Sequence, residues 1–241
     1  MAEGRGEVLR NGQIMRPVHE HPWDLSYKDA VALQTELREK LVLKGGPRAP
    51  RLVAGIDVSF ARSHGPSACY AAVVVLRFPE AEVIEEAYAA GETAFPYIPG
   101  LLTFREGPIV LAALAEIAGE PDALMFDGQG ICHPRGFGLA AHLGYLLDRP
   151  SVGCAKSLLV GEHGPLGLDA GETAPLLVTG KELGAAVRTR DGVKPVYVSP
   201  GHRVGLDAAV AIVLRATRGR RLPEPTRLAH QAVTRYRKEN I

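Results

Sequence analysis

Asp122-Ala-Leu-Met-Phe-Asp127-Gly-Gln-Gly-Ile-Cys-His133-Pro134 is the stretch on which the expected fold depends. Its apolar run, residues 123–126, is short and bounded by turn residues, which favours a buried strand over a helix. A carboxylate at the end of a buried strand is costly unless it is paired or binds a cation. The glycines after Asp127 would let another molecule approach the backbone closely. The simpler alternative is an aspartate that only caps a strand-to-loop turn.

The composition is that of an ordinary globular protein. The 241 residues are 46% hydrophobic and 23% charged, which fits one sizeable domain. No apolar run approaches the roughly 20 residues that span a bilayer, and residues 1–16 lack the apolar core of a secretory signal. The three cysteines form no close pair, so neither a disulfide framework nor a zinc site is expected. We therefore expect a cytoplasmic protein without an obligate protein partner, with a flexible extension at residues 1–22 and one domain at residues 23–241.

The order of the expected elements predicts a mixed α/β sheet. A helix begins at Ser26-Tyr-Lys-Asp29, which has the spacing of a capping box. Three strands joined by short loops then predict an antiparallel meander, at residues 52–60, 69–78 and 83–90. Strands and helices alternate after it: helices are expected at residues 103–118, 138–147, 205–218 and 226–238, and strands at the start of 122–133, at 151–155 and at 196–199. This pattern favours a single mixed sheet with helices on both sides.

Two strand carboxylates suggest a metal site. Asp57 lies inside the apolar strand Val53-Ala-Gly-Ile-Asp-Val-Ser-Phe60, although strand alternation could also place it on a solvated face. If Asp57 and Asp127 meet on neighbouring strands they repel each other, and a divalent cation removes the conflict; magnesium prefers such oxygen ligands. Glu106 could be the third ligand. Its alternative role is to complete a capping box with Thr103.

Several basic and imidazole side chains could assist chemistry at phosphate. Lys156 follows an expected strand, and His133, His202 and His230 are further candidates, although a single histidine is more often structural. Between Arg215 and Lys238 the sequence has eight basic residues and one acid, a local surface that could hold phosphates or simply be a solvated face. Zinc, Walker and dinucleotide-binding spacings are absent. The residues alone therefore predict a magnesium-type carboxylate site suited to phosphodiester chemistry, with the substrate unspecified.

Several blocks of this sequence resemble the endonuclease V family, the deoxyinosine-specific nucleases of DNA repair. The matching blocks are residues 53–60, 95–108 (Phe-Pro-Tyr-Ile-Pro-Gly-Leu-Leu-Thr-Phe-Arg-Glu-Gly-Pro), 126–131 (Phe-Asp-Gly-Gln-Gly-Ile), 133–135, 153–156, 199–202 and 221–230. They follow the family's order and, with weaker similarity between them, cover roughly residues 23 to 236.

The resemblance implies a ribonuclease-H-like fold and a magnesium-dependent activity, with manganese as a possible substitute. Asp57 and Asp127 match its metal ligands, and Glu106 matches the third acidic member. His230 matches a histidine near the metal-bound water, and Lys156 matches a lysine near the scissile phosphate.

The resemblance also implies a substrate and the residues that bind it. The substrate-binding candidates are Tyr97, Pro96, Ile98, Gly100, Gly128 and His133. Tyr97 matches the tip of a wedge that fills the gap beside an extruded base, and Gly100 and Gly128 match glycines around the base pocket, whereas His133 has no assigned role. The expected reaction is hydrolysis of the second phosphodiester bond 3′ to deoxyinosine in single- or double-stranded DNA, leaving 3′-hydroxyl and 5′-phosphate ends. The alternatives are an endoribonuclease specific for inosine in RNA, another ribonuclease-H-like nuclease, and an inactive protein that binds deaminated nucleic acid.

Overall fold

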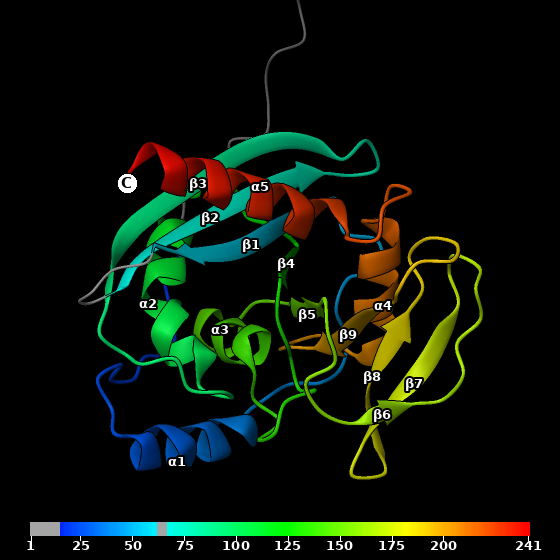
Figure 1. Cartoon of the computed structure of the whole chain (residues 1–241), viewed down its shortest axis with the longest axis horizontal. Coiled ribbons are helices and arrows are strands. Elements are labelled where there is room, and N and C mark those ends of the chain that lie inside the picture. Colours follow the sequence, from blue (N-terminus) through cyan, green and yellow to red (C-terminus); the bar gives the residue numbers. More distant parts are fainter. Residues whose placement is uncertain (1–14, 62–66) are drawn as a thin grey trace, which may run out of the picture.

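A computed structural model describes residues 15–61 and 67–241 of the chain, and within them nine strands form one mixed sheet with helices on both faces (Figure 1). The strand order is β3-β2-β1-β4-β5-β9-β8-β7-β6. The strands are β1 (Leu52–Phe60), β2 (Ser67–Arg77), β3 (Glu82–Thr93), β4 (Ala123–Phe126), β5 (Ser151–Ala155), β6 (Glu162–His163), β7 (Thr173–Val178), β8 (Lys181–Val187) and β9 (Val196–Pro200). The helices are α1 (Tyr27–Arg38), α2 (Leu102–Ala115), α3 (Leu139–Leu147), α4 (Leu206–Arg215) and α5 (Glu224–Glu239).

The predicted mixed sheet and its meander are confirmed. β1, β2 and β3 pair antiparallel, and β1, β4 and β5 pair parallel at the centre. The sequence did not predict β6, β7 and β8, which extend the far side of the sheet beyond β9. Pro175 inside β7 and the charged start of β8 conceal the strand pattern there, because proline and charged residues are depleted in strands.

Alternate residues of the central strands face two different helical layers. Ala54 and Ile56 of β1 belong to the core cluster formed with α2 and α3, whereas Val53 belongs to the cluster formed with α4 and α5. In Figure 1, α5 crosses β1 and β2 on the face opposite α2. Since side chains alternate along a strand, Asp57 lies on the same face as Val53 and therefore toward α5.

The capping box predicted at Ser26 and the alternative one considered for Glu106 have different outcomes. The Ser26 side chain accepts a hydrogen bond from the Asp29 backbone N–H at 3.2 Å and caps α1, as predicted. The alternative role considered for Glu106, a capping box with Thr103, is not formed, because α2 begins at Leu102 and its first turn has no side-chain cap. The fully buried Leu101 stands at the cap position instead, so hydrophobic anchoring fixes the start of this helix. Glu106 is therefore left without a capping role.

The described part of the expected N-terminal extension packs against α3. Met15 is buried, and the Val18 backbone N–H donates to the Leu146 carbonyl at 2.7 Å. The His21 Nε2 atom lies 2.6 Å from His142 Nε2. Residues 1–14, the rest of the segment expected to be flexible, lie outside the described residues. Among the helices of the described chain, none is both long enough and apolar enough to cross a membrane.

Candidate active site

The sheet register places Asp57 and Asp127 next to each other. Ile56 of β1 is the partner of Phe126 of β4, so the residue after each of them is an aspartate. The Asp127 backbone N–H donates to the Ile56 carbonyl at 3.3 Å and continues the pairing past the end of β4. Both aspartate side chains are largely buried, with 13% and 12% of their surface exposed. Asp57 therefore does not lie on a solvated face, which was the alternative that strand alternation allowed.

Each aspartate contacts a nitrogen group from another element. His230 of α5 places its Nδ1 atom 2.7 Å from Asp57 Oδ2. Lys156 directly follows β5, and its ammonium group forms an ion pair with Asp127 Oδ2. The Val58 backbone N–H also donates to Asp57 Oδ1 at 2.9 Å. Four of the predicted catalytic residues, from four separate parts of the chain, thus lie in one cluster.

Glu106 is the third carboxylate of this cluster, and its environment disfavours ionisation. Burial in the first turns of α2, followed by repulsion from Asp57, raises the pKa of Glu106 to about 8. Burial also raises the pKa of Asp57, with repulsion from Asp127 as the next cause. In the described part of the chain, no three His, Cys, Asp or Glu side chains are drawn together tightly enough to form a metal site as they stand. The Lys156 ammonium offsets the negative charge of Asp127 instead, and His230 forms a hydrogen bond with Asp57.

Glycines allow the close approaches that build this cluster. A Cβ atom on Gly55 would lie 2.1 Å from the backbone carbonyl group of Pro225, so the start of α5 rests directly on β1 and brings His230 over Asp57. A Cβ atom on Gly153 would lie 2.3 Å from the Gly130 nitrogen, so the loop after Asp127 lies directly on β5. Larger residues at either position would separate the segments that carry the charged groups.

Arg221 holds the segment that carries Lys156. Its guanidinium donates to the backbone carbonyl of Lys156 at 2.5 Å and to those of Pro195 and Lys194 at 2.9 and 3.0 Å. No feature of the sequence distinguished Arg221 from the other basic residues between Arg215 and Lys238 as the one that holds this segment. Because these bonds involve backbone carbonyls, no pattern of side-chain types could have indicated them.

A small pocket of about 110 Å³ lies beside the carboxylates, between residues 95–100 and the loop that follows β4. Its walls include Tyr97, Ile98, Gly100, Gln129, His133 and Leu159. Tyr97 is 71% exposed at the pocket mouth. Pro96 is exposed on the same loop but does not line the pocket, and Gly128 lies behind the lining residue Leu139.

His133 is a buried, neutral member of the pocket wall. Only 5% of its surface is exposed. Its Nδ1 atom accepts a hydrogen bond from the Arg135 backbone N–H at 3.2 Å, so the ring hydrogen is on Nε2. Burial, and next the positive charge of Arg135, lower the pKa of His133 to about 4. His133 is therefore a hydrogen-bond donor at Nε2 at neutral pH, not a cation.

His202 lies outside the cluster. Its Nε2 atom is 3.1 Å from Asp148 Oδ1, and its Nδ1 atom accepts from the Val42 backbone N–H at 3.3 Å. Both ring nitrogens therefore have structural partners. The simpler of the two interpretations, a structural histidine, is correct for this residue.

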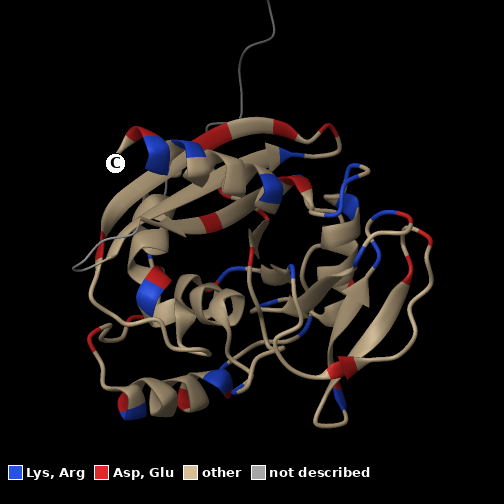
Figure 2. Ribbon diagram, in the orientation of Figure 1, with Lys and Arg blue, Asp and Glu red and all other residues tan. Residues whose placement is uncertain are grey.

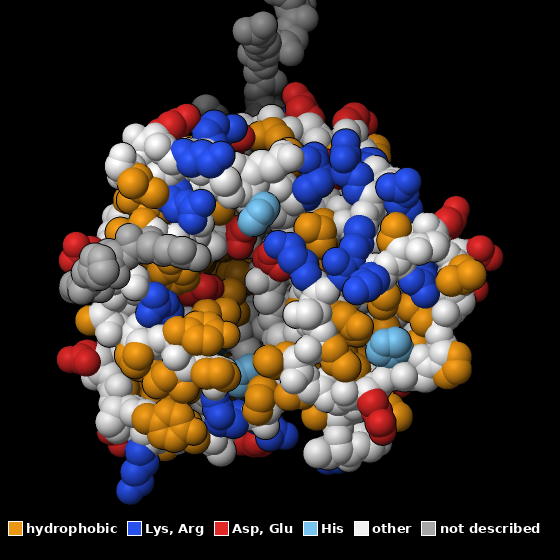
Figure 3. Space-filling model, in the orientation of Figure 1, with side chains coloured by type: hydrophobic (Ala, Val, Ile, Leu, Met, Phe, Trp, Pro, Cys, Tyr) orange, Lys and Arg blue, Asp and Glu red, His pale blue; other side chains and the backbone are white. Residues whose placement is uncertain are grey.

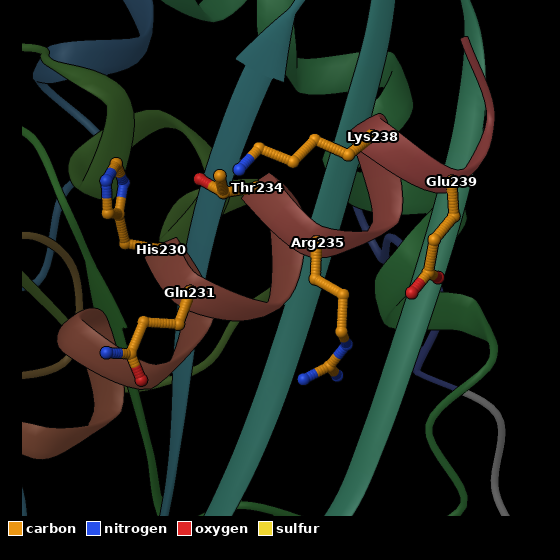
Figure 4. A pocket seen from close by; sticks show the side chains of 6 residues that line it. All are labelled: His230, Gln231, Thr234, Arg235, Lys238 and Glu239. Atoms are coloured by element: carbon orange, nitrogen blue, oxygen red, sulfur yellow. The ribbon is translucent and has the colours of Figure 1, made fainter.

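Basic side chains border the site on the surface. Lysines and arginines (blue) are frequent along α5 and in the connection between α4 and α5 (Figure 2). Figure 3 shows a hollow in this face with acidic atoms inside it and lysine and arginine side chains gathered along one rim. A second, shallower depression of about 430 Å³ lies along the outer face of α5 and begins at His230 (Figure 4). All the residues that line it belong to this one helix, so it is a surface groove beside the site and not an enclosed pocket.

This combination of fold and site is that of a ribonuclease-H-like nuclease: a mixed sheet whose central strands bring carboxylates together beside a lysine and a histidine. The profile of one family, endonuclease V, matches residues 35–231. Endonuclease V of Gloeobacter violaceus is 49% identical over 219 residues, which cover 90% of this chain and 89% of that protein. The chain belongs to the endonuclease V family and is a nuclease, as its sequence blocks predicted.

Solved structures agree with this assignment. The crystal structure of the Streptomyces avermitilis endonuclease V superimposes with a TM-score of 0.86 at 44% identity, covering 90% of this chain and 96% of that one. The Ciona intestinalis endonuclease V, 26% identical with a TM-score of 0.76, was crystallised with a 24mer DNA containing an inosine followed by a ribo-adenosine. That superposition covers 89% of this chain and 98% of the Ciona chain.

Proposed function

We propose that this chain is a magnesium-dependent repair endonuclease that recognises deoxyinosine in DNA, with residues 23–241 as its nuclease domain. It hydrolyses the second phosphodiester bond on the 3′ side of the lesion and leaves 3′-hydroxyl and 5′-phosphate ends. The observation that carries the proposal is the cluster of Asp57, Asp127 and Glu106 beside a pocket with Tyr97 at its mouth. The inosine-containing DNA bound by the Ciona relative supports the choice of lesion.

The three carboxylates have the chemistry of a magnesium-binding set, and manganese could replace magnesium there. They offer oxygen ligands only, which hard cations prefer. Burial, and next their mutual repulsion, raise the pKa of Asp57 and of Glu106, and a divalent cation held by Asp57, Asp127 and Glu106 would relieve that repulsion. A bound cation of this kind supplies Lewis-acid stabilisation of the charge that develops at the phosphate and lowers the pKa of water.

His230 and Lys156 have complementary roles in the proposed reaction. A carboxylate only accepts hydrogen bonds, so the His230 Nδ1–H donates to Asp57 and leaves Nε2 free to take a proton from the attacking water. Lys156 lies on the opposite side of the carboxylate pair, against Asp127. Its ammonium is positioned to neutralise a phosphate oxygen when substrate occupies the site.

The pocket and its exposed tyrosine suit an extruded base. A base must leave the duplex stack before its edge can be recognised, and an aromatic side chain can fill the space that it leaves. Hypoxanthine carries a carbonyl where adenine carries an amine, so N–H donors in the wall favour hypoxanthine and leave the amine of adenine unmatched. The polar groups of the wall include the side chains of Thr103 and Gln129 and neutral His133, whose Nε2–H is engaged with the Gly100 backbone.

A cleavage assay in magnesium tests the proposal. The substrates are otherwise identical oligonucleotides: duplex DNA with one deoxyinosine, RNA with one inosine, and undamaged DNA. We expect a single cut in the deoxyinosine strand at the second bond 3′ to the lesion and no cut after chelation of the metal. Equal cutting of undamaged DNA would refute recognition of inosine, and preferential cutting of the RNA would replace DNA by RNA as the substrate.

A further inference from the structure

The loop that carries Tyr97 is held at its two ends by arginines. We call residues 95–100 the wedge loop. At its start, the Arg105 Nη1 atom donates to the Phe95 carbonyl at 2.7 Å. At its end, the Gly100 carbonyl accepts from Gln34 Nε2 at 3.0 Å and from the Arg135 guanidinium. Tyr97 itself is largely exposed, so its position depends on how the ends of this loop are fixed.

Gln34 joins three parts of the chain through one buried amide. Its side chain is on α1, and only 1% of the residue is exposed. Besides Gly100, its Nε2 atom donates to the Phe137 carbonyl at 3.1 Å, while Oε1 accepts from Arg135 Nε at 2.5 Å. Both hydrogens and the oxygen of the amide are therefore used, and α1, the wedge loop and the loop after β4 are connected at one point.

Arg135 is the second residue that holds the end of the wedge loop, and it does so without an acidic partner. Across the described residues, no carboxylate lies within 4.0 Å of its guanidinium, which is only partly buried. Its hydrogen bonds go to the Gln34 amide and the Gly100 carbonyl. Gly100 has a positive φ of 81°, and a Cβ atom there would lie 2.6 Å from Arg135 Nη2. The glycine therefore allows Arg135 to cross beneath the end of the wedge loop.

We propose that Gln34 and Arg135 are positioning residues for lesion recognition: through the Gly100 carbonyl they hold the wedge loop so that Tyr97 can fill the space left by an extruded base. The inference rests on the proposed function and adds two residues to it that lie beneath the substrate-binding surface. A loop fixed in its working position before binding does not have to be ordered during binding, so more of the binding energy remains for recognition.

A comparison of duplex and single-stranded substrates distinguishes this positioning role from a general structural role. In a duplex, the wedge must compensate for lost stacking and pairing when the base leaves the helix. In a single strand, the base is already accessible, so the same loop position contributes little. A variant that merely loses stability or damages the carboxylate site would affect both substrates equally.

The experiment uses full-length Gln34→Leu and Arg135→Gln, with Thr35→Val and Arg48→Gln as controls. Thr35 is exposed on the same helix as Gln34, and Arg48 is an exposed arginine away from the loop. Each protein is assayed on a duplex with deoxyinosine opposite thymine and on the deoxyinosine strand alone. We expect kcat/KM to fall about tenfold on the duplex and less than about twofold on the single strand, with the controls unchanged. Combining Arg135→Gln with Tyr97→Ala should cost no more than Tyr97→Ala alone, because the two changes remove the same function.

Equal losses on the two substrates, or additive losses in the double variant, would overturn the proposal. If Gln34→Leu does not fold, Arg135→Lys takes its place, since lysine keeps the charge but lacks the fork that reaches two acceptors. Hydrogen exchange of the free protein is the measurement that does not depend on substrate: residues 97–101 should exchange faster in the variants and α5 should not. Unchanged exchange at residues 97–101 would contradict the proposed role of Gln34 and Arg135 in holding the wedge loop. Failure of the wild-type protein to cut either inosine substrate would instead contradict the proposed function.

Discussion

Replacing His133 by glutamine should make the protein less sensitive to acid. Burial keeps His133 neutral in the folded protein and lowers its pKa from 6.5 to about 4. The unfolded chain therefore binds one more proton than the folded chain between these values, so the free energy of unfolding falls as the pH falls from 6.5 through 4. One pKa unit corresponds to about 1.4 kcal/mol, so His133 alone should cost about 2 kcal/mol by pH 5 and about 3 kcal/mol by pH 4, relative to pH 7. In His133→Gln this part of the loss is absent.

Urea unfolding of both proteins at pH 7, 5.5 and 4.5, in a chelating buffer, measures the effect. The difference between wild type and variant at each pH removes the contributions of the other buried histidines, whose pKa values are also lowered. A constant offset between the two proteins would reflect only the hydrogen bonds of His133. If the free-energy difference does not change with pH, His133 is not buried and neutral as described, and its assignment as a donor at Nε2 is wrong.

Three further changes test other parts of the site. Asp127→Asn should lower cleavage in magnesium by on the order of a thousandfold, because a metal ligand is lost. Binding to deoxyinosine DNA, measured by fluorescence anisotropy, should persist. Full cleavage activity would refute the ligand assignment. Gly55→Ala should cost about 1–3 kcal/mol in urea unfolding, because its Cβ atom would lie 2.1 Å from the Pro225 carbonyl group; an unchanged midpoint would contradict the close contact of α5 with β1. Arg221→Gln should lower kcat about tenfold with little change in KM, because it releases the backbone of Lys156; a change in KM alone would indicate that Arg221 binds substrate instead.

The central strands were predictable because their composition carries the signal. An apolar run that ends in a carboxylate and glycines indicated β4, and the isolated charge in β1 indicated Asp57. Glu106 was ambiguous, since three-residue spacing from a threonine fits both a capping box and the interior of a helix that begins earlier. A buried leucine at the cap position decided between them, and burial of that residue depends on the packed fold.

The residues that the sequence did not reveal are those whose partners are backbone groups. Gln34 carried a weak signal, because it occupies the apolar stripe of α1 with Ala30 and Leu37, where a polar residue needs a buried partner. Its partners, the carbonyls of Gly100 and Phe137, are far away in sequence and give no sign in the residue types. Tyr97 and Asp127 can be recognised as chemical groups, whereas the supports that fix their positions depend on which backbones the fold brings together. Mutagenesis restricted to recognisable catalytic side chains would therefore leave unexamined the bonds that set where the wedge and the lysine lie.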